Sequence, residues 1–136
     1  MFKLIKILNA GRNVPEPQRL PVTSGASYKI GCALVLSSGK LAHCSATTAP
    51  TYIAAQSLAS GAGSTLLAYP VTPGMIFETT FSAAPTSIVA GNKLTLTVDS
   101  ASNAVGVTAT TTSGVATVYD MRGAAAAGDA VEVRFS

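Results

Sequence analysis

Hydrophobic and polar residues alternate along much of the chain with a period of two, which is typical of β-strands. The clearest case is the run at 93–99, in which Leu94, Leu96 and Val98 are expected to face a core while the threonines between them face outward. The segment at 130–135 repeats this alternation. Both segments are therefore predicted to be strands with one buried face.

Further segments rich in β-branched or aromatic residues are separated by Gly, Pro, Asn, Asp or Ser, which favour turns. Residues 28–36 and 41–44 flank the turn sequence Ser-Ser-Gly-Lys and predict a hairpin. The other predicted strands are 51–58, 65–71, 75–81, 104–110 and 115–119. Many short strands with turn residues between them predict an all-β domain, either a small β-barrel or a β-sandwich.

The first 24 residues differ from the rest and predict an extended N-terminal arm (1–24) followed by a β-barrel domain (25–136). A short strand is expected at 2–8, and prolines at 15, 17 and 21 then favour extended backbone without amide donors. Such an arm has no core of its own and must pack on another surface, which is its own domain, a sister subunit or a foreign protein. The residues expected to make its contacts are Phe2, Lys3, Leu4, Lys6, Arg12, Pro15, Pro17 and Arg19.

The surface is predicted to carry few charges, because only 11% of the 136 residues are charged against about 25% in typical soluble domains. A weakly solvated surface favours association, so a homo-oligomer is expected. The contact is predicted in the small-residue segments 101–114 or 124–127. The residues chosen are Val105, Val107, Ala124 and Ala125.

The net charge of +3 is concentrated in the first twenty residues, without a dense run of Lys and Arg with interleaved aromatic residues. Nucleic acid is therefore not expected as a partner. Lys6 interrupts the opening apolar run, so neither a secretory signal nor a membrane span is predicted. We expect synthesis in a cytoplasm, where Cys32 and Cys44 favour the reduced state.

No arrangement of side chains predicts catalysis. His43 and Cys44 are adjacent, and neighbours on a strand point to opposite faces, which is unfavourable for a catalytic dyad. One histidine and two cysteines fall short of the usual four ligands of structural zinc. The segment 61–65 resembles a phosphate-binding loop but lacks its lysine. We therefore predict no enzyme activity, no cofactor and no metal.

Two acidic residues have particular expected partners. Glu78 lies in an apolar strand, and an outward orientation is favoured, whereas an inward carboxylate would need a cation beside it. Asp120 is expected to form a local ion pair with Arg122.

Four stretches together resemble small bacteriophage capsid decoration (cement) proteins. They are Gly25–Leu41, Pro50–Ala54, Val71–Glu78 and Gly128–Phe135. The resemblance implies a small barrel or β-tulip-like domain, often trimeric, that clamps major capsid protein subunits on the outside of an expanded head. It brings no catalytic residues, and the long basic arm departs from the pattern.

The expected function is therefore that of a virion structural protein, made in the host cytoplasm and located on the capsid surface. It would stabilise the capsid by bridging major capsid protein subunits, as a homotrimer. The alternative is a tail, fibre or head-surface module that binds a receptor or glycan through loop residues such as Tyr69 or Tyr119. An enzymatic use of His43 and Cys44 is a third, less favoured hypothesis.

Overall fold

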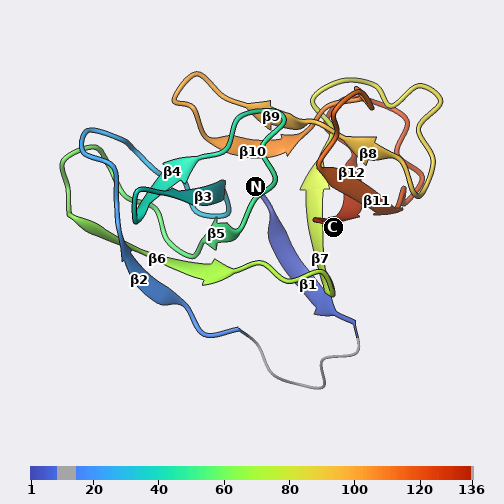
Figure 1. The fold of residues 1–136 in the computed structure, drawn as a ribbon. Coiled ribbons are helices and arrows are strands. Elements are labelled where there is room, and N and C mark those ends of the chain that lie inside the picture. The colour runs from blue at the N-terminus through green and yellow to red at the C-terminus, as the bar shows by residue number, and fades with distance from the viewer. Residues whose placement is uncertain (9–14, 136) are drawn as a thin grey trace.

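The computed structural model describes residues 1–8 and 15–135, and these residues form an all-β fold without helices. Twelve strands in the described residues form two antiparallel sheets (Figure 1). Among the same residues, no helix is long and apolar enough to cross a membrane. The prediction of an all-β domain is confirmed.

The smaller sheet has five strands and the larger sheet seven. The order in the smaller sheet is β1 (Lys3–Ile7), β7 (Met75–Thr80), β12 (Ala130–Arg134), β11 (Ala116–Asp120) and β8 (Lys93–Leu94). The order in the larger sheet is β2 (Gln18–Pro21), β6 (Thr65–Pro70), β5 (Tyr52–Ala54), β3 (Ala33–Ser37), β10 (Ala104–Val107) and β9 (Leu96–Val98), and β4 (Lys40–His43) pairs with β3 beside this path.

The main hydrophobic core joins the two sheets. Ile53 and Val107 from the larger sheet belong to the same buried cluster as Phe77 and Val131 from the smaller sheet. We call this the first cluster. Because residues of both sheets are buried together, the fold is sandwich-like.

A second cluster lies within the larger sheet and includes Leu34, Leu41 and Leu66. An isolated bridge between Val22 and Leu41 brings the ends of β2 and β4 together, so the sheet curls around these residues. Neither sheet forms a closed barrel in the described residues. Of the two predicted architectures, the sandwich agrees with the structure.

The predicted strand at 93–99 is divided between the two sheets. Leu94 belongs to β8 and Leu96 to β9, and Thr95 between them is only 7% exposed. The Thr95 hydroxyl lies 2.6 Å from the Thr108 hydroxyl, which satisfies it in the interior. Since the chain changes sheets at Thr95, the alternation does not continue, and Val98 is 39% exposed. The expectations that Thr95 faces outward and Val98 faces the core are wrong.

The predicted hairpin is confirmed, with β3 and β4 joined by a two-residue turn. Ser38 and Gly39 have φ angles of 51° and 76°, which fits a turn that requires positive φ at both central positions. Residues 28–32 are not part of β3. They form an isolated bridge from Tyr28 to Leu58 and a tight turn.

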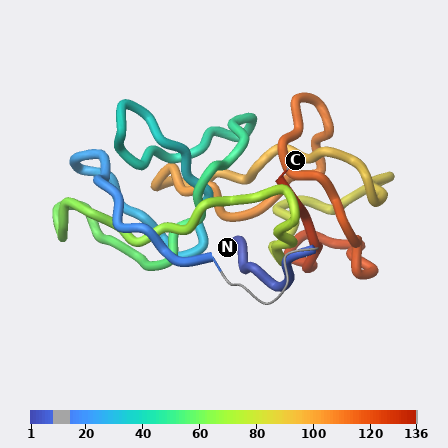
Figure 2. The backbone as a smooth tube through the Cα atoms, turned by 60° about the horizontal axis from the view of Figure 1, so that its bottom comes forward, coloured from blue at the N-terminus to red at the C-terminus, as the bar shows by residue number. Residues whose placement is uncertain are grey.

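The described part of the predicted arm (1–24) is joined to both sheets by strand pairing. Strand β1 pairs with β7 of the smaller sheet and β2 pairs with β6 of the larger sheet. Phe2 is 1% exposed, with its ring centroid 5.2 Å from that of Phe135. Figure 2 shows the N-terminal residues between the two halves of the molecule. The described part of residues 1–24 therefore packs on the chain's own domain, because the apolar side chains of these N-terminal residues complete the core.

Candidate interaction site

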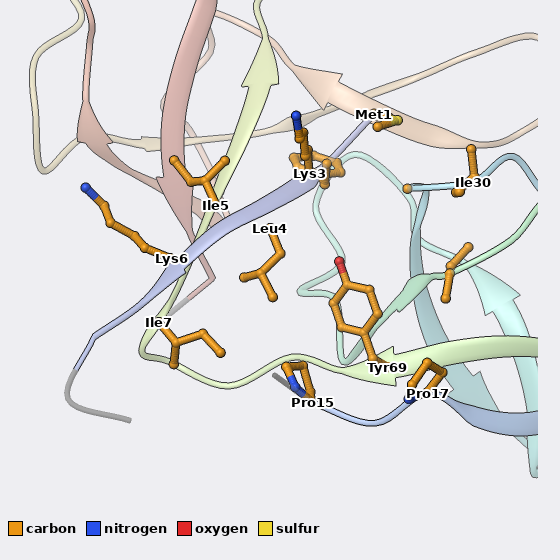
Figure 3. Close-up of a pocket in the computed structure, with 14 residues that line it drawn as sticks. Met1, Lys3, Leu4, Ile5, Lys6, Ile7, Pro15, Pro17, Ile30 and Tyr69 are labelled. Atoms are coloured by element: carbon orange, nitrogen blue, oxygen red, sulfur yellow. The ribbon is translucent and has the colours of Figure 1, made fainter. Parts of the chain in front are cut away.

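A groove of about 620 Å³ runs along β1, between the two sheets (Figure 3). Strand β1 forms one wall. The opposite wall contains Tyr69 of β6, together with Ala54 and Ala55 at the end of β5. Pro15 and Pro17, which precede β2, also line it. Most of the lining is apolar, which suits contact with hydrophobic groups.

Most of the residues predicted to make the arm contacts lie at this groove. Six of them line it: Phe2, Lys3, Leu4, Lys6, Pro15 and Pro17. Arg19 lies on β2 and donates a hydrogen bond to the Thr65 hydroxyl at 3.3 Å. Arg12 lies outside the described residues. Ala54 and Ala55 of the opposite wall were not among the predicted residues, and Tyr69 was predicted only as a loop residue for receptor binding, because strand pairing, rather than any local motif, brings this wall beside β1.

A tight turn at Lys29–Cys32 fixes the start of β1. The Gly31 carbonyl accepts a hydrogen bond from the Phe2 amide, and the Gly31 amide donates to the Ala54 carbonyl, both at 2.8 Å. Gly31 has a φ of 78°, and a Cβ there would lie 2.7 Å from the Met1 Cβ. Only glycine therefore lets the N-terminal residues approach this turn so closely.

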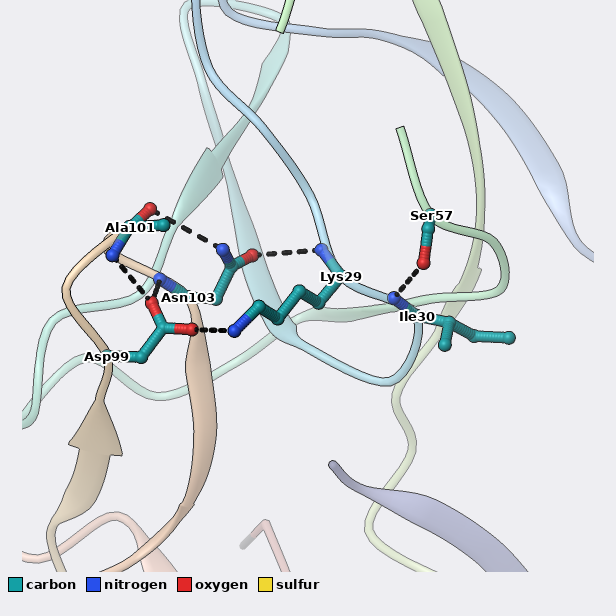
Figure 4. A network of polar contacts seen from close by, with 6 residues as sticks. All are labelled: Lys29, Ile30, Ser57, Asp99, Ala101 and Asn103. Atoms are coloured by element: carbon teal, nitrogen blue, oxygen red, sulfur yellow. Dashed lines mark hydrogen bonds and ion pairs between the residues drawn. The ribbon is translucent and has the colours of Figure 1, made fainter. Parts of the chain in front are cut away.

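A polar network anchors the same turn to the loop between β9 and β10 (Figure 4). The Lys29 ammonium lies 2.6 Å from the Asp99 carboxylate, and the Lys29 amide donates to the Asn103 side chain at 3.0 Å. This lysine, followed by backbone amides of Asn103 and its loop, holds the pKa of Asp99 below its ordinary value of 3.8. Ile30 donates its amide to the Ser57 hydroxyl at 2.9 Å. Hydrogen bonds thus hold the turn to the β9–β10 loop on one side and to Ser57 on the other.

The outer face of the smaller sheet carries a chain of ion pairs that reaches β1. The Lys6 ammonium lies 3.3 Å from Glu132 and 4.7 Å from the centre of the Tyr119 ring. The Arg122 guanidinium lies 2.5 Å from Glu78 and 3.6 Å from Glu132. Glu132 is only 8% exposed, so Lys6 and Arg122 supply the positive charge that its buried carboxylate needs and hold β1 against the sheet.

The contacts of Arg122 bear on two of the sequence predictions, the orientation of Glu78 and the ion pair of Asp120. The Glu78 side chain is 35% exposed and reaches the Arg122 guanidinium, which agrees with an outward orientation. The predicted ion pair between Asp120 and Arg122 is wrong. Asp120 instead accepts a hydrogen bond from the Arg122 amide at 2.9 Å, while the guanidinium turns toward the two glutamates.

The histidine and the two cysteines do not form a reactive group. Cys32 and Cys44 are free and buried, and burial raises the pKa of each thiol to about 12, so both remain protonated near neutral pH. Cys44 packs in the first cluster, whereas the His43 ring contacts Tyr28 of the second cluster in a tilted arrangement with ring centres 4.8 Å apart. Desolvation lowers the pKa of His43. The adjacent pair therefore points to opposite sides of the strand.

Of the four predicted oligomer contacts, one is freely exposed. Val107 is fully buried in the first cluster, so the prediction that it contacts another subunit is wrong. Val105 and Ala124 are half-buried and pack against the molecule's own clusters. Ala125 is exposed, in the loop after β11. The apolar face of β10 is used for packing in the protein's own core. The low-complexity sequence at 101–114 did not show that this face is buried.

The two tyrosines proposed for receptor binding lie on strands instead of loops. Tyr69 belongs to β6 and stacks against Phe77 at 6.5 Å, and burial raises its pKa to about 12. Tyr119 belongs to β11, beneath the Lys6 ammonium. Neither forms part of an open loop platform. The described residues also contain no group of three or more His, Cys, Asp or Glu side chains placed to hold a metal ion.

Comparison with known proteins gives no family for this chain. A scan against protein-family models and a search of the curated proteins found no match. A function is therefore inferred from the sequence resemblance and from the groove beside β1.

Proposed function

We propose that this chain is a virion structural protein that binds the outside of a phage capsid and stabilises it by bridging major capsid protein subunits. The proposal combines the sequence resemblance with one structural observation, the apolar groove along β1. Synthesis in the host cytoplasm and location on the capsid surface belong to the same proposal.

The groove suits a protein partner because exposed apolar side chains surround it. Met1 is 53% exposed, Ile30 is 49% exposed and Ile5 is 37% exposed, and all three line the groove. Apolar residues gathered at one exposed site favour a protein–protein contact. The small number of charged residues points in the same direction, since a covered surface needs less solvation.

The contacts that fix the turn at one end of the groove favour bridging between subunits. The turn at Lys29–Cys32 is bound to Phe2, Ala54 and the loop of Asp99, so both sheets contribute to its fixed position. A preorganised surface loses little conformational entropy when it binds. Such a domain can hold two neighbouring subunits at a constant separation.

The test is binding to expanded heads prepared without this protein, measured by co-sedimentation and by the temperature at which the heads disrupt. Deleting residues 1–21 is unsuitable, because it would remove β1, β2 and the buried Phe2. We instead compare Ile30→Asn with Leu36→Asn. Leu36 is 41% exposed on β3 and does not line the groove.

The unsubstituted protein should bind the heads and raise their disruption temperature. Ile30→Asn should weaken binding about ten-fold, since burying an isoleucine contributes about 1.5–3 kcal/mol. Leu36→Asn should bind as well as the unsubstituted protein. If the unsubstituted protein does not bind heads, the proposed function is wrong.

A further inference from the structure

We propose that the groove binds an extended, acidic segment of a partner protein, which adds as a strand to the free edge of β1. Its apolar side chains enter the groove, and its carboxylates lie beside Lys3 and Lys6. The inference rests on the proposed function in taking a capsid subunit as the natural partner. The chemistry of the segment follows from the groove itself.

The free edge of β1 is the first feature that supports an added strand. Within the described residues β1 pairs only with β7, so its other side has backbone groups without a neighbouring strand. Such an edge is a template for an added strand. The groove extends along this strand from Met1 to Ile7, which allows a segment of several residues to lie against it.

The shape of the β1 wall is the second feature. The register with β7 shifts between Leu4 and Lys6, so Ile5 is an extra residue in the strand. Leu4 and Ile7 are half-buried against the first cluster and also line the groove. The bulge thus presents apolar side chains to a bound segment, while Ile5 remains exposed at the rim.

The opposite wall explains why an added strand would pair with β1. Pro15 and Pro17 have no amide hydrogen, and Tyr69 presents an aromatic ring to the groove (Figure 3). This wall offers apolar contact and little backbone pairing. A bound segment therefore finds hydrogen bonds on one side of the groove and pockets for its side chains on the other.

The charges at the groove select an acidic partner. Its lining contains two cationic side chains, Lys3 and Lys6, and no carboxylate among the described residues. Lys6 already lies near Glu132, whereas Lys3 takes part in no ion pair among the described residues. Lys3 is therefore the better placed of the two to meet a carboxylate of the partner.

The experiment uses the full chain and a synthetic peptide of about eight residues, a usual strand length, in which valine and glutamate alternate. A matched peptide carries lysine in place of glutamate. Binding is measured by calorimetry, and protection of individual backbone amides is measured by hydrogen exchange. The glutamate peptide should bind and slow the exchange of β1 amides, whereas the lysine peptide should not bind.

Two pairs of variants locate the site. Ala55→Trp should abolish binding by filling the groove, while Ala59→Trp, at an exposed residue that does not line it, should leave binding unchanged. Lys3→Gln should weaken binding by about two- to five-fold, as expected for loss of one exposed ion pair. Lys40→Gln, on the exposed β3–β4 hairpin, should have no such effect.

Equal binding of both peptides, or protection confined to strands other than β1, would overturn the inference. The two proposals fail separately. If Ala55→Trp still decorates heads at full occupancy, the inference about the groove is wrong and the proposed function stands. If the peptide binds as described but the unsubstituted protein does not decorate heads, the proposed function is wrong and the inference about the groove stands.

Discussion

The single residue on which the groove depends most directly is Gly31. Its φ of 78° favours glycine, and its missing side chain leaves room for Met1 and for the hydrogen bond from Phe2. The sequence showed a glycine between two predicted strand residues. It could not show that the space beside this glycine is filled by the start of the chain.

Gly31→Ala should destabilise the protein more than Gly25→Ala. Gly25 has a φ of 79°, and a Cβ added there would have no atom within 4 Å, so its substitution measures backbone strain alone. That strain is expected to cost about 1–2 kcal/mol, and the Gly31 variant adds a clash with Met1. Urea unfolding checks this difference, and equal losses of unfolding free energy would show that the N-terminal residues do not pack against the turn.

At the scale of elements, the sequence predicted strands well wherever local alternation and turn residues were sufficient. Strands β6, β7 and β12 lie within predicted segments, and β3, β4 and β11 each extend one residue beyond theirs. The division at Thr95 was not predictable, because it depends on which sheet each half joins. No groove was predicted. The contact residues predicted for the arm supply its β1 wall together with Pro15 and Pro17, whereas Ala54, Ala55 and Tyr69 come from about fifty or more positions later along the chain.

The network between the Lys29 turn and the β9–β10 loop is an element-scale contact with a dependence on pH. The pKa of Asp99 is lowered in the folded protein, chiefly by its hydrogen bond from Lys29. The folded state therefore binds a proton less readily than the unfolded state. The stability from this contact is present above the ordinary pKa of 3.8 and is lost as the pH falls through the lowered pKa.

Asp99→Asn should flatten the fall in unfolding free energy below about pH 4, the ordinary range of an aspartate. The amide oxygen retains an acceptor for the loop amides, so the change mainly removes charge. We expect a loss of about 1 kcal/mol or less at neutral pH, as for a largely exposed pair. Urea unfolding from pH 2 to pH 7 measures this against Glu16→Gln, and the same acid dependence in all three proteins would exclude Asp99 as its source.

At the scale of the whole molecule, the N-terminal residues connect the two halves of the fold. Strand β1 belongs to the smaller sheet and β2 to the larger, while Phe2 packs in the core that both sheets share. The groove lies where these parts meet. A partner bound there would contact both sheets, so binding and the stability of the whole domain are expected to be coupled.

Assembly into a homo-oligomer is expected because the surface carries little charge. With 11% charged residues, a lone domain has little charge with which to resist association. A closed homotrimer would cover part of the surface and would multiply weak contacts with a capsid through avidity. The choice of a trimer over a dimer rests on the resemblance to decoration proteins. Among the residues predicted for the contact, Ala125 is the freely exposed one.

Light scattering should therefore give about three times the chain mass of 13.7 kDa, the value for a closed three-fold assembly. Ala125→Arg should shift the protein to monomers, because it places an unpaired charge in the contact. Its backbone hydrogen bond to Asp129 remains available, so the fold should be retained. Ala59→Arg is the matched control at another exposed alanine. A monomer at every concentration, together with particles that show no grouping of the protein in threes, would contradict the trimer.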